Sequence, residues 1–248
     1  MSMYTTEEYY DEYIYDDCQN EEKYEIIKNS HKVVSFPMNS QKSNMKNKSC
    51  DYKTLAIMTL YSNMTPKDIS YSKGENELYR YVYKNKIIKF TEEIEDLSGN
   101  KINTIIKNMR KLSQLESRLI TACKNESGDI YYIINYCDLH ERKYVTIEED
   151  MLRVLINTGN SNMIKIYILL KYLCKNKEKK ITREFIAKEI GLSINSKNLM
   201  VVSDCTKILS ASGFISKRSD YKYGNDIKCD MYYSIKSYDE WKDVMDKN

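Results

Sequence analysis

The 248-residue sequence has only seven glycines, two prolines and two histidines, and these shortages exclude several kinds of site. The glycines form neither G-x-G-x-x-G nor G-K-[ST], so a glycine-rich nucleotide-binding loop is absent. His31 and His140 form no His-x-His motif, which excludes the metal site of a rolling-circle nickase. Cys137 and His140 lack a second pair to complete four zinc ligands. We therefore expect no enzymatic activity, no metal and no cofactor.

Long apolar runs are also absent. No run approaches the roughly 20 residues needed to cross a bilayer, and the first residues are acidic where a secretory signal would be basic and then apolar. The seven cysteines are odd in number and widely spaced, which is typical of reduced thiols rather than of a disulfide framework. The sequence thus predicts a cytoplasmic protein that makes no membrane contact. Its excess of Lys, Asn, Ile and Tyr is typical of A/T-rich genes, such as those of a low-G+C bacterium, its plasmids or its phages.

The charge is divided unevenly along the chain. The net charge is +3, but residues 1–27 carry nine acids against Lys23 alone, so that this segment has a net charge of −8 and the rest of the chain +11. An acidic tail beside a basic body is typical of proteins that meet a polyanion, although the acids equally suit a solubilising tail. Residues 28–50 are rich in Lys, Asn and Ser and lack periodicity, which predicts a linker. Residues 1–50 are therefore expected to be a disordered, acidic, tyrosine-rich tail followed by a polar linker. A short helix between Glu7 and Lys28 is left open.

Residues 51–140 have the element order of a winged helix-turn-helix domain. Helices are expected over 55–61, 91–98 and 101–112, with mixed helix and strand over 78–90 and a hairpin formed by 118–123 and 129–136. Thr91 is predicted to cap the second of these helices and Gly99 to end it.

Residues 141–248 repeat that order and predict a second winged domain with a C-terminal helix. A strand is expected over 143–147, helices over 148–158, 163–174, 182–190 and 196–212, a hairpin formed by 214–218 and 227–235, and a last helix from Tyr238. Thr182 is the expected cap of the helix over 182–190, Gly191 ends that helix at a tight turn, and Trp241 is a packing anchor. The helix over 163–174 is apolar on most of its circumference, which favours burial in its own domain, and homodimerisation elsewhere stays open. The fold class is therefore α+β, mainly α, with two tandem winged helix-turn-helix domains.

The second helix of such a motif can lie in the major groove of DNA. In the first module its outward face has four cations, two amides and a hydroxyl, with no acid: Lys101, Asn103, Thr104, Lys107, Asn108, Arg110 and Lys111. Cations suit phosphates, while Arg and Asn can make bidentate contacts to guanine and adenine. We expect this face to bind double-stranded DNA, and the alternative is a solvated face on a structural helix.

The second module is less basic on the corresponding helix and more basic on its hairpin. The candidate DNA contacts are Lys197, Asn198, Ser203, Thr206 and Lys207 on the helix and Lys217, Arg218, Lys222 and Lys228 on the wing. We expect the wing to lie along the phosphate backbone, where cations add affinity without reading sequence. Protein contact is the alternative, because winged domains also bind proteins.

The runs Tyr144–Ile147, Met151–Arg153, Asn157–Asn160 and Ile164–Tyr167, followed by Thr182–Ser193, resemble winged-helix proteins of low-G+C bacterial plasmids and phages. Many of those proteins are replication initiators or related regulators. The first module, with Ile87–Phe90 and the helix over 100–112, looks like their leading winged helix. The resemblance covers 51–236 loosely and 144–216 at motif level, and the acidic tail has no counterpart in it. It implies double-stranded DNA binding and recruitment of host replication proteins.

These observations together predict a non-enzymatic, sequence-specific DNA-binding protein that initiates or regulates plasmid or phage replication. A transcriptional repressor would use the same surfaces. A protein–protein adaptor, such as a helicase-loader-like primosomal protein, is the alternative from another class.

Overall fold

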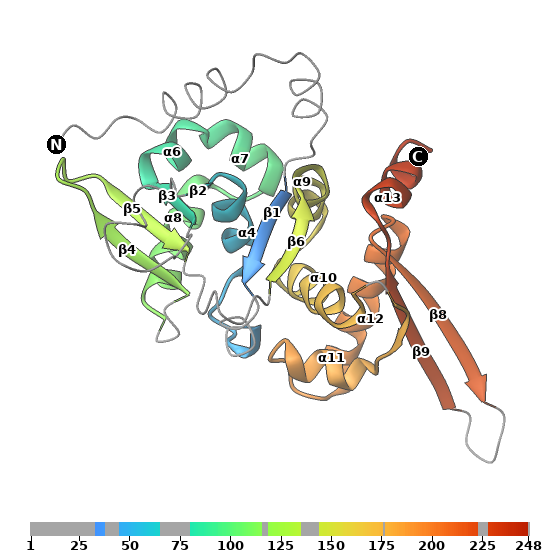
Figure 1. Ribbon diagram of the computed structural model, residues 1–248. Helices are drawn as coiled ribbons and strands as arrows, with labels where there is room; N and C mark the ends of the chain where they lie inside the picture. The colour runs from blue at the N-terminus through green and yellow to red at the C-terminus, as the bar shows by residue number, and fades with distance from the viewer. Residues whose placement is uncertain are drawn as a thin grey trace, which may run out of the picture. The chain divides into compact units, whose positions relative to one another are not determined.

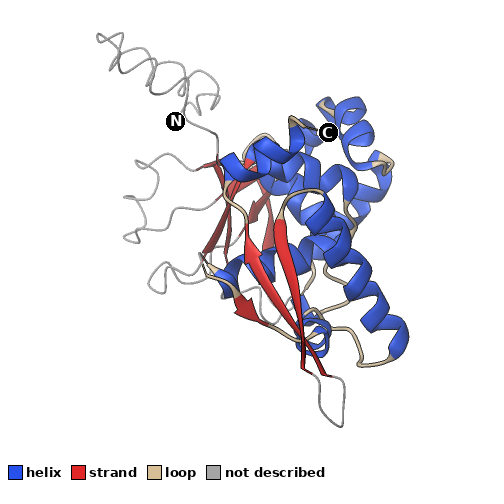
Figure 2. Ribbon diagram, turned by 90° about the vertical axis from the view of Figure 1, so that its right-hand side faces the viewer, coloured by secondary structure: helices blue, strands red, loops and turns tan. Residues whose placement is uncertain are grey.

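Helices and short antiparallel strands alternate along the chain, and helix is the more abundant, so the structure is mixed α and β (Figures 1 and 2). This computed structural model describes residues 33–37, 45–64, 80–115, 119–134, 144–175, 177–222 and 228–247. Residues Val33–Asn248 form one compact unit. The predicted acidic tail lies outside the described residues. Among the described helices, none is both long and apolar enough to cross a bilayer.

The N-terminal half, residues 45–134, combines helices with a four-stranded antiparallel sheet. Its helices are α4 (Tyr52–Leu60), α6 (Lys84–Lys89), α7 (Thr91–Ser98) and α8 (Ile102–Ser113). The sheet has the order β2-β3-β5-β4, formed by β2 (Asn63–Met64), β3 (Arg80–Tyr83), β5 (Ile130–Ile134) and β4 (Ile120–Lys124). Tyr132 and Ile134 alternate with less buried residues along β5, as one covered sheet face requires, and the buried Val82 lies opposite Tyr132 on β3. The predicted hairpin, and the mixture of strand and helix over 78–90, are therefore confirmed.

The C-terminal half, residues 144–247, has more helix. It contains α9 (Glu149–Thr158), α10 (Ser161–Cys174), α11 (Arg183–Glu189), α12 (Ser196–Ala211) and α13 (Tyr238–Met245). A three-stranded antiparallel sheet has the order β7-β9-β8, formed by β7 (Lys179–Lys180), β9 (Lys228–Ile235) and β8 (Ile215–Lys222). The predicted helices and hairpin of this half are present, whereas β7 was not predicted. Trp241 is 4% exposed beside Phe214, which confirms its role as a packing anchor.

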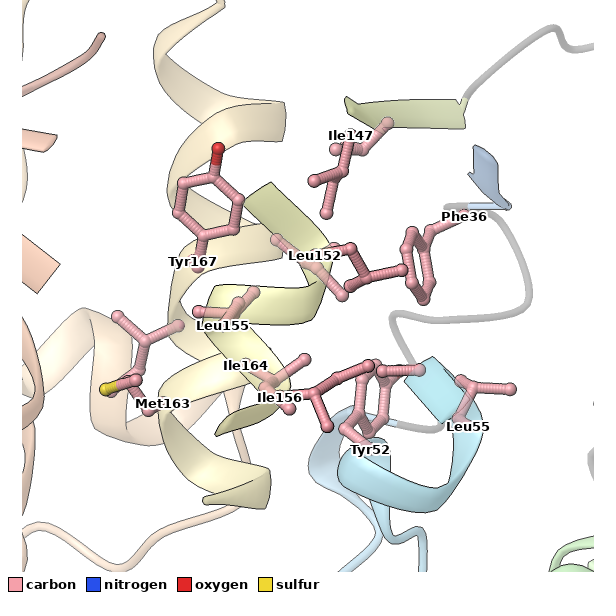
Figure 3. Packing of buried hydrophobic residues seen from close by; sticks show 14 of the residues in the cluster. Phe36, Tyr52, Leu55, Ile147, Leu152, Leu155, Ile156, Met163, Ile164 and Tyr167 are labelled. Atoms are coloured by element: carbon pink, nitrogen blue, oxygen red, sulfur yellow. The ribbon is translucent and has the colours of Figure 1, made fainter. Parts of the chain in front are cut away.

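A shared core joins the two halves, and the segment before them adds a strand to the C-terminal half. β1 (Val33–Pro37) pairs with β6 (Tyr144–Glu148), so that Val34 lies opposite Ile147. Figure 3 shows side chains of β1, α4, β6, α9 and α10 packed in one apolar cluster. Residues 163–170 of α10 are all buried, so this apolar helix is a core element, as its sequence predicts.

The structure corrects the prediction of a linker over 28–50. Val33–Pro37 is a strand, and Met45 and Cys50 are each 1% exposed. Lys165 of α10 donates from Nζ to the carbonyl oxygens of Met45 at 3.0 Å and of Asn47 at 3.1 Å. These partners lie more than 100 residues away in the sequence, so local periodicity carries no sign of them.

The predicted helix caps are confirmed in part. Gly99 ends α7 in the left-handed conformation, with φ of 66°, and Thr182 caps α11 by accepting a hydrogen bond from the Phe185 N–H. Thr91, however, is the first residue of α7 and not its cap, because α6 runs almost directly into α7 and Phe90 occupies the position between them. The Thr91 hydroxyl donates to the Ile88 carbonyl at 2.6 Å instead.

Candidate nucleic-acid interface

Helix α8 is held against the N-terminal half by apolar side chains on one face and by a cap at its first turn. Ile105, Met109 and Leu112, spaced at i, i+4 and i+7, are fully buried. Glu95 of α7 caps the start of α8, because its Oε1 accepts from the Ile102 N–H at 2.8 Å. The position of α8 is therefore determined at both its buried face and its N-terminus.

The opposite face of α8 is exposed and carries most of the residues predicted to bind DNA. Its exposed residues are Asn103, Thr104, Lys107, Arg110 and Lys111, and we call this set the α8 face. It contains three cations and no acid. Among the described residues, no salt bridge involves Lys107 or Lys111. Arg110 lies near the Tyr132 hydroxyl: burial raises the pKa of Tyr132, and Arg110 opposes that increase.

Lys101 and Asn108, which were also predicted to bind DNA, have protein partners instead. Lys101 donates from Nζ to Glu95 Oε2 at 2.7 Å, and this contact holds the pKa of Glu95 below its usual value. Asn108 is half-buried, and its Nδ2 donates to Asp51 Oδ2 at 2.9 Å. The prediction that Asn108 faces outward is therefore wrong. Its spacing of i+3 from Ile105 and i−4 from Leu112 is a signal that could have placed it beside the core.

The candidate contacts on α12 differ in character from those of α8. Lys197 is exposed, but Lys207 pairs with Asp204 at 3.7 Å, and Asn198 Nδ2 donates to the Ser193 carbonyl at 2.8 Å. Ser203 is half-buried. Thr206 is fully buried, so the prediction that it faces outward is wrong. It lies at i+4 from Val202 and i−3 from Leu209, both of them core residues, and that spacing could have revealed its position.

Two cations of the hairpin formed by β8 and β9 also have partners. Lys217 donates from Nζ to Thr206 Oγ1 at 3.1 Å. Arg218 contacts Glu178 and Asp220, and its guanidinium lies 4.4 Å from the centre of the Tyr232 ring. Lys222 and Lys228 pair in the ladder at the end of the described strands, and their side chains lie outside the described residues. Of the predicted wing cations, Arg218 is therefore already paired with acids and Lys217 with a hydroxyl.

The outward surface of α11 and α12 is partly apolar. Met200 and Ile208 of α12 are 65% and 45% exposed, with Asp204 between them at i+4 from Met200. Phe185 of α11 and Ile194 of the turn are also exposed. We call Phe185, Ile194, Met200 and Ile208 the α12 apolar patch. Because α11 packs against α12, these side chains lie on neighbouring elements. Groups of large exposed apolar side chains are typical of protein-binding surfaces.

The described residues contain no cluster of three or more His, Cys, Asp or Glu side chains that could hold a metal ion. A polar hollow of about 430 Å³ lies beside the start of α10, lined by Lys48, Asn160, Ser161, Asn162, Lys165, Ile190 and Leu192. Its lining has ammonium, amide and hydroxyl groups but no carboxylate. It therefore lacks the carboxylates by which proteins usually hold a hard cation.

No protein-family model matches the chain, and no curated protein shows significant sequence similarity to it. Function is therefore inferred from the residues of the structure and their surroundings.

Proposed function

We propose that this protein is a non-enzymatic, sequence-specific double-stranded DNA-binding protein that initiates or regulates plasmid or phage replication. In this proposal the two halves are winged helix-turn-helix domains, with α7, α8 and the β4–β5 hairpin in the first and α11, α12 and the β8–β9 hairpin in the second. The exposed, acid-free α8 face is the observation that carries the proposal.

The α8 face has the chemistry that a helix in the major groove needs. Lys107 and Lys111 can neutralise phosphates, because no described acid pairs with them. Asn103 and Arg110 can form bidentate hydrogen bonds to the edges of adenine and guanine. The net charge of +11 outside residues 1–27 would attract DNA over a longer range and speed its association.

The first test is a selection of bound fragments from the replicon that encodes the protein, followed by affinity measurements at two salt concentrations. We expect one or a few fragments to bind tightly, with an affinity that falls as salt rises. Lys107→Ala should reduce the slope of log affinity against log salt by about 0.9, the contribution of one phosphate contact. Lys207→Ala is the matched control, since Lys207 already pairs with Asp204. Weak binding of equal strength on all fragments would contradict the proposal.

The same selection separates initiation from transcriptional repression. Directly repeated sites beside an A/T-rich stretch favour an initiator, because such a stretch costs less to open. A single site over a promoter favours a repressor.

The α12 apolar patch favours a second candidate function, that of a protein–protein adaptor. Its members are exposed apolar side chains, and two of the predicted cations of this half already have protein partners, Lys207 with Asp204 and Lys217 with the Thr206 hydroxyl. In that case the α8 face would be a solvated surface, and neither Lys107→Ala nor Lys111→Ala would change DNA affinity.

A further inference from the structure

Asn108 connects α8 to the N-cap residue of α4 by a hydrogen bond between side chains. Its Nδ2 lies 2.9 Å from Asp51 Oδ2 and 3.4 Å from Thr54 Oγ1. The buried face of α8 is already covered by Ile105, Met109 and Leu112. The amide therefore adds a directional contact at the border between the buried face and the α8 face.

Asp51 is itself held in place by hydrogen bonds to the start of α4. It is the N-cap of α4, and its carboxylate accepts from the N–H groups of Lys53 and Thr54 at 3.3 Å and from Thr54 Oγ1 at 2.6 Å. All of α4 except Lys53 is buried. The next residue, Tyr52, donates from its backbone N–H to Ser161 Oγ of α10 at 2.9 Å, which ties the same cap to the C-terminal half.

Apolar contacts and hydrogen bonds restrain a helix differently. Apolar burial is non-directional, so it tolerates a small rotation of α8 about its axis, whereas a hydrogen bond weakens steeply when its geometry changes. Because the side chains of the α8 face lie on the far side of the axis from the core, any such rotation displaces Asn103, Lys107 and Arg110 sideways. The hydrogen bond from the Ile102 N–H to Glu95 restrains the first turn of α8. Beyond that turn, the alignment of these side chains with the bases depends on what else prevents the rotation.

We propose that Asn108 is a positioning residue, which sets the rotation of α8 through its hydrogen bond to Asp51 and so aligns the α8 face with DNA. This inference rests on the proposed function. It replaces the prediction that Asn108 contacts a base. It also makes Asp51, which lies on a different helix, part of the DNA-binding mechanism.

An exchange of the two side chains tests this assignment. Asn108→Asp places two carboxylates at hydrogen-bond distance, and we expect DNA affinity to fall by about tenfold or more, because like charges repel and the bond is lost. The double variant Asp51→Asn/Asn108→Asp restores a donor and an acceptor with their roles reversed. Asparagine also remains a good N-cap for α4. We expect the double variant to regain affinity to within about threefold of the original protein, together with its preference among DNA sequences.

The control is Asn103→Asp, which adds the same charge on the exposed side of α8. Asp51→Asn should not rescue that variant, because Asn103 has no contact with Asp51. Circular dichroism and thermal unfolding of each variant show that the comparison is made between folded proteins. If the exchanged pair stays as weak as Asn108→Asp, then Asn108 contacts DNA directly and the positioning role is wrong.

Lys107→Ala and Lys111→Ala distinguish this result from a failure of the proposed function. If these variants weaken binding but the exchange does not restore it, the positioning role alone is overturned. If neither they nor Asn108→Asp changes DNA affinity, the α8 face is not a DNA interface, and both proposals fall together.

Discussion

Arg153 of α9 donates to Glu93 of α7 at 2.8 Å, and this ion pair connects the two halves of the chain. The same guanidinium binds Glu149 at 3.0 Å, while the Tyr61 hydroxyl donates to Glu93 at 2.7 Å. Tyr61 and Arg153 together hold the pKa of Glu93 below its usual value. The two candidate DNA-binding halves are therefore joined by polar contacts as well as by a shared core.

Arg153→Ala should lower the free energy of unfolding by about 1 kcal/mol, because a partly exposed network of ion pairs is lost. Urea unfolding followed by circular dichroism measures the change. Lys207→Ala is the control, since it removes an isolated and more exposed pair with Asp204. Equal effects of the two substitutions would mean that the Arg153 network does not stabilise the contact between the halves.

Gly191→Ala should be far more harmful than Gly99→Ala. Both glycines have positive φ, 81° and 66°, so each substitution costs about 1–2 kcal/mol in backbone strain. A Cβ on Gly99 would meet open space, whereas a Cβ on Gly191 would collide with the backbone of Lys46. We therefore expect a total loss of about 3 kcal/mol or more at Gly191, since overpacking adds a further penalty. Similar unfolding midpoints for the two variants would show that the backbone around Lys46 shifts away from the new Cβ at little cost in stability.

Much of the fold can be predicted from the sequence where the signal is local. Thr182 and Gly191 mark the ends of α11, and the spacing of Ile105, Met109 and Leu112 marks the buried face of α8. The strand Val33–Pro37 could not be predicted in this way, because it is short, lies in a polar stretch and pairs with β6 more than 100 residues later.

Less of the candidate site can be predicted from the sequence, because residue type alone does not show which polar residues of a helix face outward. Thr206 and Asn108 lie beside the core, and helical spacing alone could have excluded both. Lys217 and Arg218 are different, since their partners Thr206 and Glu178 come from other elements. No local pattern indicates that a cation is already paired across the fold.

Stability should fall steeply at alkaline pH because of Cys50. Burial raises the pKa of this thiol to about 12, while Lys165 opposes the increase. Below pH 9 the thiol is protonated in both the folded and the unfolded chain. Between pH 9 and pH 12 the unfolded thiol ionises and the folded one does not, so unfolding becomes easier by about 1.4 kcal/mol for each pH unit.

Urea unfolding at several pH values between 8 and 11, in the presence of a reductant, measures this dependence. Cys50→Ala should reduce the slope by the contribution of one group, whatever its effect on stability at pH 8. An unchanged slope would mean that the Cys50 thiol ionises as readily in the folded chain as in the unfolded one.

The two candidate recognition helices can be separated by placing the same new charge on each. Thr104 on the α8 face and Met200 in the α12 apolar patch are both exposed, so glutamate at either position should leave the fold intact. Thr104→Glu should reduce DNA affinity by about tenfold or more, since it puts an acid among the phosphate-binding cations. Met200→Glu should change affinity little, because the outward surface of α12 already carries Asp204 and apolar side chains. Equal losses in a fluorescence anisotropy titration would place α12 in contact with DNA after all, and a loss with Met200→Glu alone would move the interface from the first half of the chain to the second.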